Sequence, residues 1–157
     1  MRKQKGFSLI ELLIVVTIIG IVASIAIPNL LASRRAANEG SAQSSLRTIN
    51  SGEATYRVTS GNGQYGTLAM LGSQRIIDSV LASATKSGYD FTLGAPQVLA
   101  GPPAQYWAYA LPSITSGVGK TGTRRFAIAE DGVLRVDTTL SAPANRGAVG
   151  NMAVAGN

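Results

Sequence analysis

The side chains that could do chemistry are few in this sequence, and their types limit what it could catalyse. It has no histidine and no cysteine, which removes the commonest general base, thiolate metal sites and any Ser-His or Cys-His nucleophile pair. An enzyme would have to use carboxylates, lysine or tyrosine alone. No paired or EF-hand-like spacing of carboxylates predicts a catalytic, metal or cofactor site. The carboxylates considered are Asp78, Asp90, Glu130, Asp131 and Asp137.

Glu11 is the carboxylate whose surroundings require an explanation. It is the single ionisable side chain in the run FSLIELLIVVTIIGIVASIAI, the 21 residues from Phe7 to Ile27. Such a run is long enough for a helix to cross a bilayer, where a charge costs about 2.5–3.5 kcal/mol even on a lenient scale. A cation at the same depth would lower that cost, and cutting the chain between Gly6 and Phe7 would create one. We hypothesise that Glu11 pairs with the Phe7 amine of a neighbouring copy.

Charge is distributed unevenly along the chain. Charged residues make up 14% of it, against about 25% in soluble domains. Of 14 basic residues, Arg2, Lys3 and Lys5 precede the apolar run, which predicts a cytoplasmic N-terminus and an exported remainder. The pairs Arg34-Arg35 and Arg124-Arg125 lack interleaved aromatics. They are expected on a solvated surface and not in a nucleic-acid site.

Three other interpretations of the N-terminal segment stay open. It could be a plain single-pass anchor, or a secretory signal peptide cut after Ala26, which would release a soluble periplasmic binding domain. Neither gives Glu11 a partner. A membrane-anchored enzyme would require a carboxylate pair in the exported part.

The residues from Lys5 to Leu13, Lys-Gly-Phe-Ser-Leu-Ile-Glu-Leu-Leu, followed by Gly20 and Pro28, resemble the type IV pilin superfamily. The resemblance implies that prepilin peptidase cuts between Gly6 and Phe7 and methylates the new Phe7 amine. It also implies that Glu11 docks each incoming subunit and that the stretch between Gly20 and Pro28 loses helicity in the filament.

By the same resemblance, the chain is a structural subunit of a type IV pilus, without catalysis and without a cofactor. Its partners would be further copies of itself, prepilin peptidase, and an inner-membrane assembly platform with its ATPases. It would begin as an inner-membrane precursor and end in an extracellular filament. The alternative within the family is a pseudopilin of type II secretion. Those proteins usually carry a Trp-Gly motif near a calcium site, whereas Trp107 is flanked by Tyr106 and Ala108.

Periodicity predicts an α+β fold, in which a long N-terminal helix with a protruding apolar half packs on a small antiparallel sheet, as in pilins. Apolar residues at helical spacing after Pro28 extend the helix to about Arg57, and Asp131-Gly132 predicts a two-residue type I′ hairpin. Strands are expected over 89–93, 105–111, 124–130 and 133–138. The segments are a leader (1–6), an apolar helix (7–28), its amphipathic continuation (29–57), a connecting loop with a short helix (58–88), a sheet (89–140) and a flexible tail (141–157).

Alternation along the expected strand 105–111 separates its aromatic side chains. Tyr106 and Ala108 should lie on one face of the strand, with Trp107 and Tyr109 on the other. We expect one of these faces to pack in the core and the other to contact a neighbouring subunit. The tail offers little to bury, so it is expected to be mobile in an isolated subunit.

Overall fold

The chain divides into two compact units, Met1–Arg34 and Arg35–Asn157. The computed structural model describes residues 6–94 and 104–156. The predicted basic leader residues Arg2, Lys3 and Lys5 therefore lie outside the described residues.

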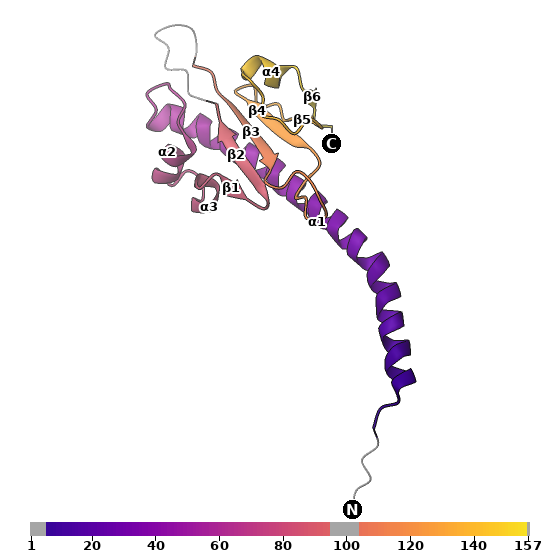
Figure 1. Cartoon of the computed structure of the whole chain (residues 1–157). Coiled ribbons are helices and arrows are strands. Elements are labelled where there is room, and N and C mark those ends of the chain that lie inside the picture. The colour runs from indigo at the N-terminus through magenta and orange to yellow at the C-terminus, as the bar shows by residue number, and fades with distance from the viewer. Residues whose placement is uncertain (1–5, 95–103, 157) are drawn as a thin grey trace, which may run out of the picture. The chain divides into compact units, whose positions relative to one another are not determined.

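Helix α1, Leu9–Thr59, supplies the helix of the first unit and continues into the second (Figure 1). Its N-terminal stretch is apolar on all sides, and its few hydroxyl groups bond back to the helix. Thr17 Oγ1 donates to the carbonyl of Leu13 at 2.7 Å, and Ser24 Oγ donates to that of Ile21 at 2.7 Å. These hydroxyls therefore need no water, as a helix in an apolar environment requires.

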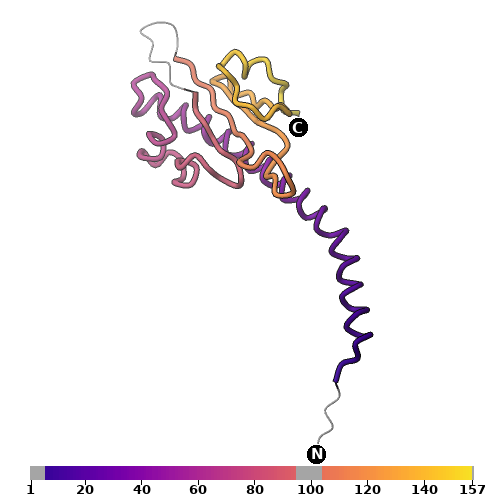
Figure 2. The backbone as a smooth tube through the Cα atoms, in the orientation of Figure 1, coloured from indigo at the N-terminus to yellow at the C-terminus, as the bar shows by residue number. Residues whose placement is uncertain are grey.

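The second unit is built on a six-stranded antiparallel sheet with the strands in sequence order, β1 to β6 (Figure 2). The predicted α+β fold, with a long helix on an antiparallel sheet, is confirmed. Its elements after α1 are α2 (Leu68–Ser73), α3 (Ser79–Ala82), β1 (Thr85–Lys86), β2 (Tyr89–Leu93), β3 (Trp107–Pro112), β4 (Arg125–Ala129), β5 (Arg135–Asp137), α4 (Arg146–Gly150) and β6 (Ala153–Val154).

The core lies between one face of α1 and one face of the sheet. Ala42, Leu46 and Ile49 of α1 are fully buried, as their helical spacing predicts. They belong to one apolar cluster with Phe126 of β4 and other strand residues. Gly52 is the next residue on this face, and a Cβ there would lie 3.1 Å from Leu71 Cδ2. Close packing of α2 on α1 therefore accounts for a glycine inside the helix.

The β4–β5 connection differs from the predicted two-residue turn. The register pairs Ala127 with Arg135, and the amide of Gly132 donates to the carbonyl of Ala129 at 2.9 Å. A type I′ turn needs positive φ at both central residues, but in this turn only Gly132 has it, at 70°. The connection is a three-residue loop with Gly132 in the left-handed conformation. A carboxylate oxygen of Asp131 accepts the amide of Val133 at 3.0 Å, which is the predicted turn role of that aspartate.

Strand β3 separates its side chains as predicted, and the C-terminal segment covers part of the second face. Tyr106 and Ala108 are buried in the main core. Trp107 and Tyr109 pack, half-buried, on a second cluster that contains Val149 and Met152 of the C-terminal segment. The area of this face left for a neighbouring subunit is therefore smaller than the sequence suggests.

The C-terminal segment is ordered, which the sequence did not predict. Asn145 caps α4 by accepting the amide of Ala148 at 2.9 Å, and β6 pairs with β5. The expectation of a mobile tail failed because Val149 and Met152, although isolated in the sequence, are both buried against the sheet.

We expect Val149→Ala to lower the free energy of unfolding by about 2 kcal/mol, because two buried methyl groups are lost and a small cavity remains. Val154→Ala is the matched control, since Val154 lies in the same segment and is 66% exposed. Denaturant unfolding of the full-length chain in detergent, followed by Trp107 fluorescence, measures both. Equal stabilities of the two variants would contradict the packing described here.

Candidate functional site

The candidate site is the N-terminal end of α1, where the Glu11 side chain bonds back to the backbone of Ser8. The backbone amide of Ser8 donates to Glu11 Oε2 at 2.8 Å. Ser8 precedes the first helical residue, Leu9, so the spacing Ser-x-x-Glu is that of a capping box. Glu11 therefore has a role within its own chain, satisfying an amide that the helix leaves unpaired.

Phe7 and Gly6 lie immediately before this cap. Phe7 is 88% exposed, and its nitrogen belongs to a peptide bond in the uncut chain. Among the described residues, nothing lies within 4 Å of a Cβ built on Gly6, and its φ lies outside the left-handed region. Neither packing nor backbone conformation within the chain therefore explains a glycine at this position. A requirement for it would have to come from another protein that handles the segment.

Gly20 and Pro28 lie within the helix without interrupting it. A Cβ on Gly20 would meet nothing within 4 Å, so contacts inside this chain do not select glycine there. Small residues let apolar helices approach one another closely. Pro28 lacks the amide that would complete a helical hydrogen bond, yet α1 continues past it to Thr59.

The N-terminal stretch of α1 carries apolar side chains that the rest of the described chain does not cover. The most hydrophobic 18-residue window of α1 has a mean hydropathy of 2.8 and none of it is buried within the chain. By length and composition this helix is able to cross a membrane. The large apolar side chains that are at least 49% exposed here are Phe7, Leu9, Ile10, Leu12, Leu13, Ile14, Val15, Val16, Ile18, Ile19, Ile21, Val22, Ile25, Ile27 and Leu30.

In the second unit, Glu39 fixes the β3–β4 connection to α1. One carboxylate oxygen accepts the Thr123 amide at 2.8 Å and the Thr123 hydroxyl at 2.7 Å, and the other accepts Nε and Nη2 of Arg124. Burial opposes the charge, but the hydrogen bonds from Thr123 and the ion pair with Arg124 outweigh it, and the pKa of Glu39 is lowered. Arg125 is 8% exposed and pairs with Asp137 at 2.6 Å. The predicted solvated position is therefore wrong for Arg125, whereas Arg124 is exposed as predicted.

Glu53 is a second buried carboxylate on α1, and it has no cation partner among the ion pairs of the described chain. Its Oε2 accepts the Gly66 amide at 2.9 Å, and within the described residues Oε1 has no hydrogen-bond donor. Burial raises the pKa of Glu53 to about 7, although the hydrogen bond from Gly66 opposes this. Sequence reasoning missed Glu39 and Glu53, but both continue the spacing of Ala42, Leu46 and Ile49.

We expect Glu53→Gln to remove a pH dependence of stability. Between pH 4.5 and about 7 the folded chain holds a proton that the unfolded chain has released, so wild-type stability should fall as pH rises through this window. The variant should be more stable than wild type at pH 8, by on the order of 2 kcal/mol, and similar to it near pH 4.5. Denaturant unfolding of the full-length chain in detergent across this range measures the effect.

The matched control for that experiment is Glu39→Gln. The pKa of Glu39 in the wild type is lowered. The charged Glu39 carboxylate therefore stabilises the folded chain above pH 4.5, and this stabilisation is lost as pH falls further. The control should therefore be destabilised at pH 8. An unchanged pH slope in Glu53→Gln would contradict the role given to Glu53.

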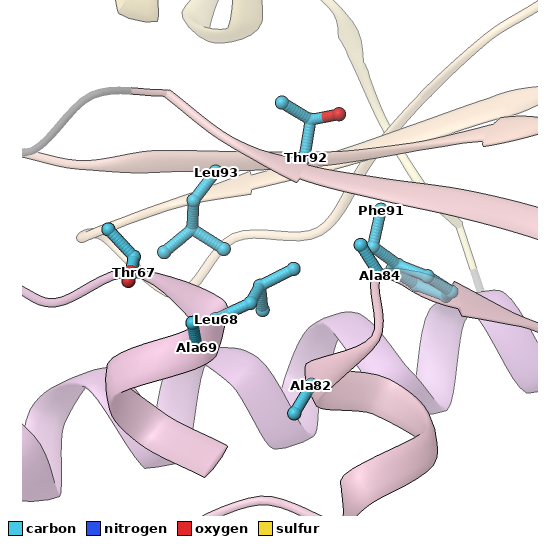
Figure 3. Close-up of a pocket in the computed structure, with 8 residues that line it drawn as sticks. All are labelled: Thr67, Leu68, Ala69, Ala82, Ala84, Phe91, Thr92 and Leu93. Atoms are coloured by element: carbon cyan, nitrogen blue, oxygen red, sulfur yellow. The ribbon is translucent and has the colours of Figure 1, made fainter. Parts of the chain in front are cut away.

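The described part of the second unit offers little to a metal or a polar ligand. No group of three potential metal-ligating side chains occurs among the described residues. A pocket of about 460 Å³ lies between α2, α3 and β2 (Figure 3). The hydroxyl oxygen of Thr67 there already caps α2 by accepting the Met70 amide. The lining is otherwise almost wholly apolar: Leu68, Ala69, Ala82, Ala84, Phe91, Thr92 and Leu93.

The fold and the N-terminal segment together define a pilin-like protein, with an apolar membrane-competent helix leading into a small α+β head. Residues 1–27 match the prokaryotic N-terminal methylation motif. The type IV wide pilus major component PilA4 of Thermus thermophilus is 34% identical over 128 residues, which cover 78% of this chain and 92% of that protein. The chain belongs to the type IV pilin superfamily.

Other relatives match over less of their length. The type II secretion system core protein G of Escherichia coli is 31% identical over 91 residues, 55% of this chain and 61% of that protein. The type IV major pilin protein PilA of Myxococcus xanthus is 39% identical over 54 residues, 34% of this chain and 24% of that protein. No solved structure matches with comparable significance.

Proposed function

We propose that this chain is a non-catalytic structural subunit of a type IV pilus. Prepilin peptidase cuts between Gly6 and Phe7 and methylates the new Phe7 amine. The subunit waits in the inner membrane with its N-terminus on the cytoplasmic side. An assembly platform and its ATPases then move it into an extracellular filament, where α1 packs against other copies. The observation that carries this proposal is the uncovered apolar stretch of α1, because a helix apolar all round needs lipid or other helices around it.

The match to the pilus component supports a pilus over a secretion pseudopilin. It extends over 92% of that relative, whereas the match to the E. coli secretion protein extends over 61% of its length. The pseudopilin remains the second candidate, since several secretion core proteins are 28–38% identical over parts of the chain. Intact cells distinguish the two: a pilus subunit is sheared from the surface in long fibres, and a pseudopilin stays in the envelope.

Assembly would give Glu11 a second partner. In the uncut chain its carboxylate accepts the Ser8 amide. Cutting converts the Phe7 nitrogen from a peptide amide into an ammonium group, which is a stronger, charge-assisted donor. A carboxylate has two acceptor oxygens, so Glu11 can keep its own helix cap and also bind the Phe7 ammonium of a neighbour. Such a pair would fix the axial register of one helix against the next.

We expect Gly6→Leu to block cutting and leave the precursor in the membrane. The change adds a side chain where the chain itself has open space, so it should not disturb the fold. Intact-mass measurement of the purified chain shows whether residues 1–6 remain. Thr17→Val is the control, because it alters a side chain in the same stretch that bonds only to its own helix. A mature start near Ile27 in the wild type would instead support the signal-peptide interpretation.

We expect Glu11→Gln to be cut normally and to form few or no filaments. Glutamine can still cap the helix by accepting the Ser8 amide, but it cannot form an ion pair with the Phe7 ammonium. Glu11→Ala, which loses both interactions, should assemble no better. Mass spectrometry of the N-terminus and the yield of sheared filaments measure the two steps separately. Wild-type filament yield from Glu11→Gln would restrict Glu11 to helix capping.

A further inference from the structure

The connection between β3 and β4 carries two apolar side chains that the described chain leaves exposed. Within the 113–120 loop, Ile114 is 50% exposed and Val118 is 77% exposed, and neither belongs to the two apolar clusters of the second unit. The other residues of the loop are serine, threonine, glycine and lysine. The loop therefore presents an apolar tip on the outside of this unit.

The 113–120 loop is held in a defined shape. The amide of Thr121 donates to the carbonyl of Ile114 at 3.0 Å, and the amide of Ile114 donates to Thr121 Oγ1 at 3.2 Å. A hydrogen bond from the Lys120 amide to the Gly117 carbonyl, at 3.4 Å, closes the tip. A loop that is already ordered loses less conformational entropy when it binds. Its apolar tip is therefore suited to a fixed contact.

The pocket between α2, α3 and β2 is an apolar hollow beside the main core (Figure 3). Its volume of about 460 Å³ is within the range of pockets that bind ligands, and none of its lining residues is charged. Leu68 and Phe91 in the lining are buried members of the main cluster, and Leu93 packs against that cluster. Apolar side chains placed in the pocket would therefore extend the core without burying a charge.

The apolar tip and the pocket lie towards opposite ends of the same pair of strands. Tyr89, the first residue of β2, pairs with Pro112, the last residue of β3, so the loop starts at this end. The pocket is lined by the other half of β2, from Phe91 to Leu93. Strand β2 spans about 14 Å at 3.4 Å per residue. The second unit therefore carries an apolar projection towards one end of its strands and an apolar hollow towards the other.

We infer that the 113–120 loop of one copy of this chain binds in the pocket between α2, α3 and β2 of another copy. Ile114 and Val118 are the side chains that enter the pocket. The inference rests on the proposed function as a filament subunit. It adds a contact between the second units of neighbouring subunits to the packing of α1.

A second copy suits this pocket better than a small apolar ligand does. Each copy supplies one tip and one pocket, so the two surfaces are present in equal number. The tip is also separated from the pocket of its own unit by the length of β2. A contact that joins two different surfaces of identical subunits is heterologous, and it continues as an open helical filament where its rotation does not close a ring. Such a contact is the kind that a homopolymer requires.

The test uses the absence of cysteine from the sequence, which makes each introduced cysteine a unique cross-linking site. Filaments of the full-length chain with both Val118→Cys and Ala69→Cys are sheared from cells and treated with a short bis-maleimide. Ala69 lines the pocket and is exposed. The control pair is Val154→Cys with Ala69→Cys, because Val154 is 66% exposed on β6 and belongs to neither surface.

We expect the first pair to give a ladder of cross-linked oligomers, several-fold stronger than the control pair gives. Cells that make the Val118→Cys and Ala69→Cys chains as separate single variants should give dimers only. A ladder no stronger than that of the control pair would overturn the inference and leave the filament function standing. Cross-links confined to single chains would place the tip in its own pocket and also overturn it. Wild-type cells without surface fibres would overturn both the proposed function and the inference.

Val118→Asp tests the same contact without a cross-linker. The side chain is 77% exposed, so the fold should tolerate the change, but the contact would bury an unpaired carboxylate. We expect the yield of sheared fibres to fall several-fold, while intact mass shows normal cutting between Gly6 and Phe7. Val118→Leu, which stays apolar, and Val154→Asp, on β6, should both keep the wild-type yield. A wild-type yield from Val118→Asp would overturn the inference.

Discussion

Helix α1 has to be covered by two different kinds of neighbour along one backbone. Up to Leu30 its apolar side chains point in all directions, so a single small sheet could not bury them and lipid or other helices must do so. From Glu39 onward only a stripe is buried, through Ala42, Leu46 and Ile49 to Glu53. The sheet covers only this stripe of the helix. The change from full circumference to stripe coincides with the division of the chain into two units.

The three carboxylates of α1 differ in how the helix and the rest of the chain accommodate a charged group. Glu11 accepts an amide at the helix start, where the helix dipole also favours a negative charge. Glu39 is satisfied by Thr123 and Arg124 and stays charged. Glu53 has one hydrogen bond and no cation, so burial favours its protonated form. Of the three, Glu11 is the one that the described part of its own chain leaves exposed, which suits it to a partner outside the subunit.

The sequence was most informative where a pattern repeated. Helical spacing located the buried stripe, and alternation located β2 and the two faces of β3. Strands of two residues, such as β1 and β6, leave no period to detect. The hairpin at Asp131-Gly132 was predicted, but its loop has three residues instead of two, which changes the register of the two strands. The buried ends of the stripe, Glu39 and Glu53, were missed because residue type was given more weight than spacing.

The cysteine-free C-terminal region is fixed by several weak interactions that act on different elements. Arg146 Nε donates to Glu130 at 2.7 Å, Arg125 pairs with Asp137, and the amide of Ala155 donates to the carbonyl of Leu134 at 2.9 Å. A disulfide typically contributes about 2–4 kcal/mol by restricting the unfolded chain, whereas a single partly exposed ion pair such as Arg146 with Glu130 contributes little. The buried Arg125 and the burial of Val149 and Met152 beside Trp107 therefore carry more of the attachment than the exposed contacts do. Trp107 and Tyr109 stay half-buried beside this cluster, so the C-terminal segment occupies only part of that face of β3.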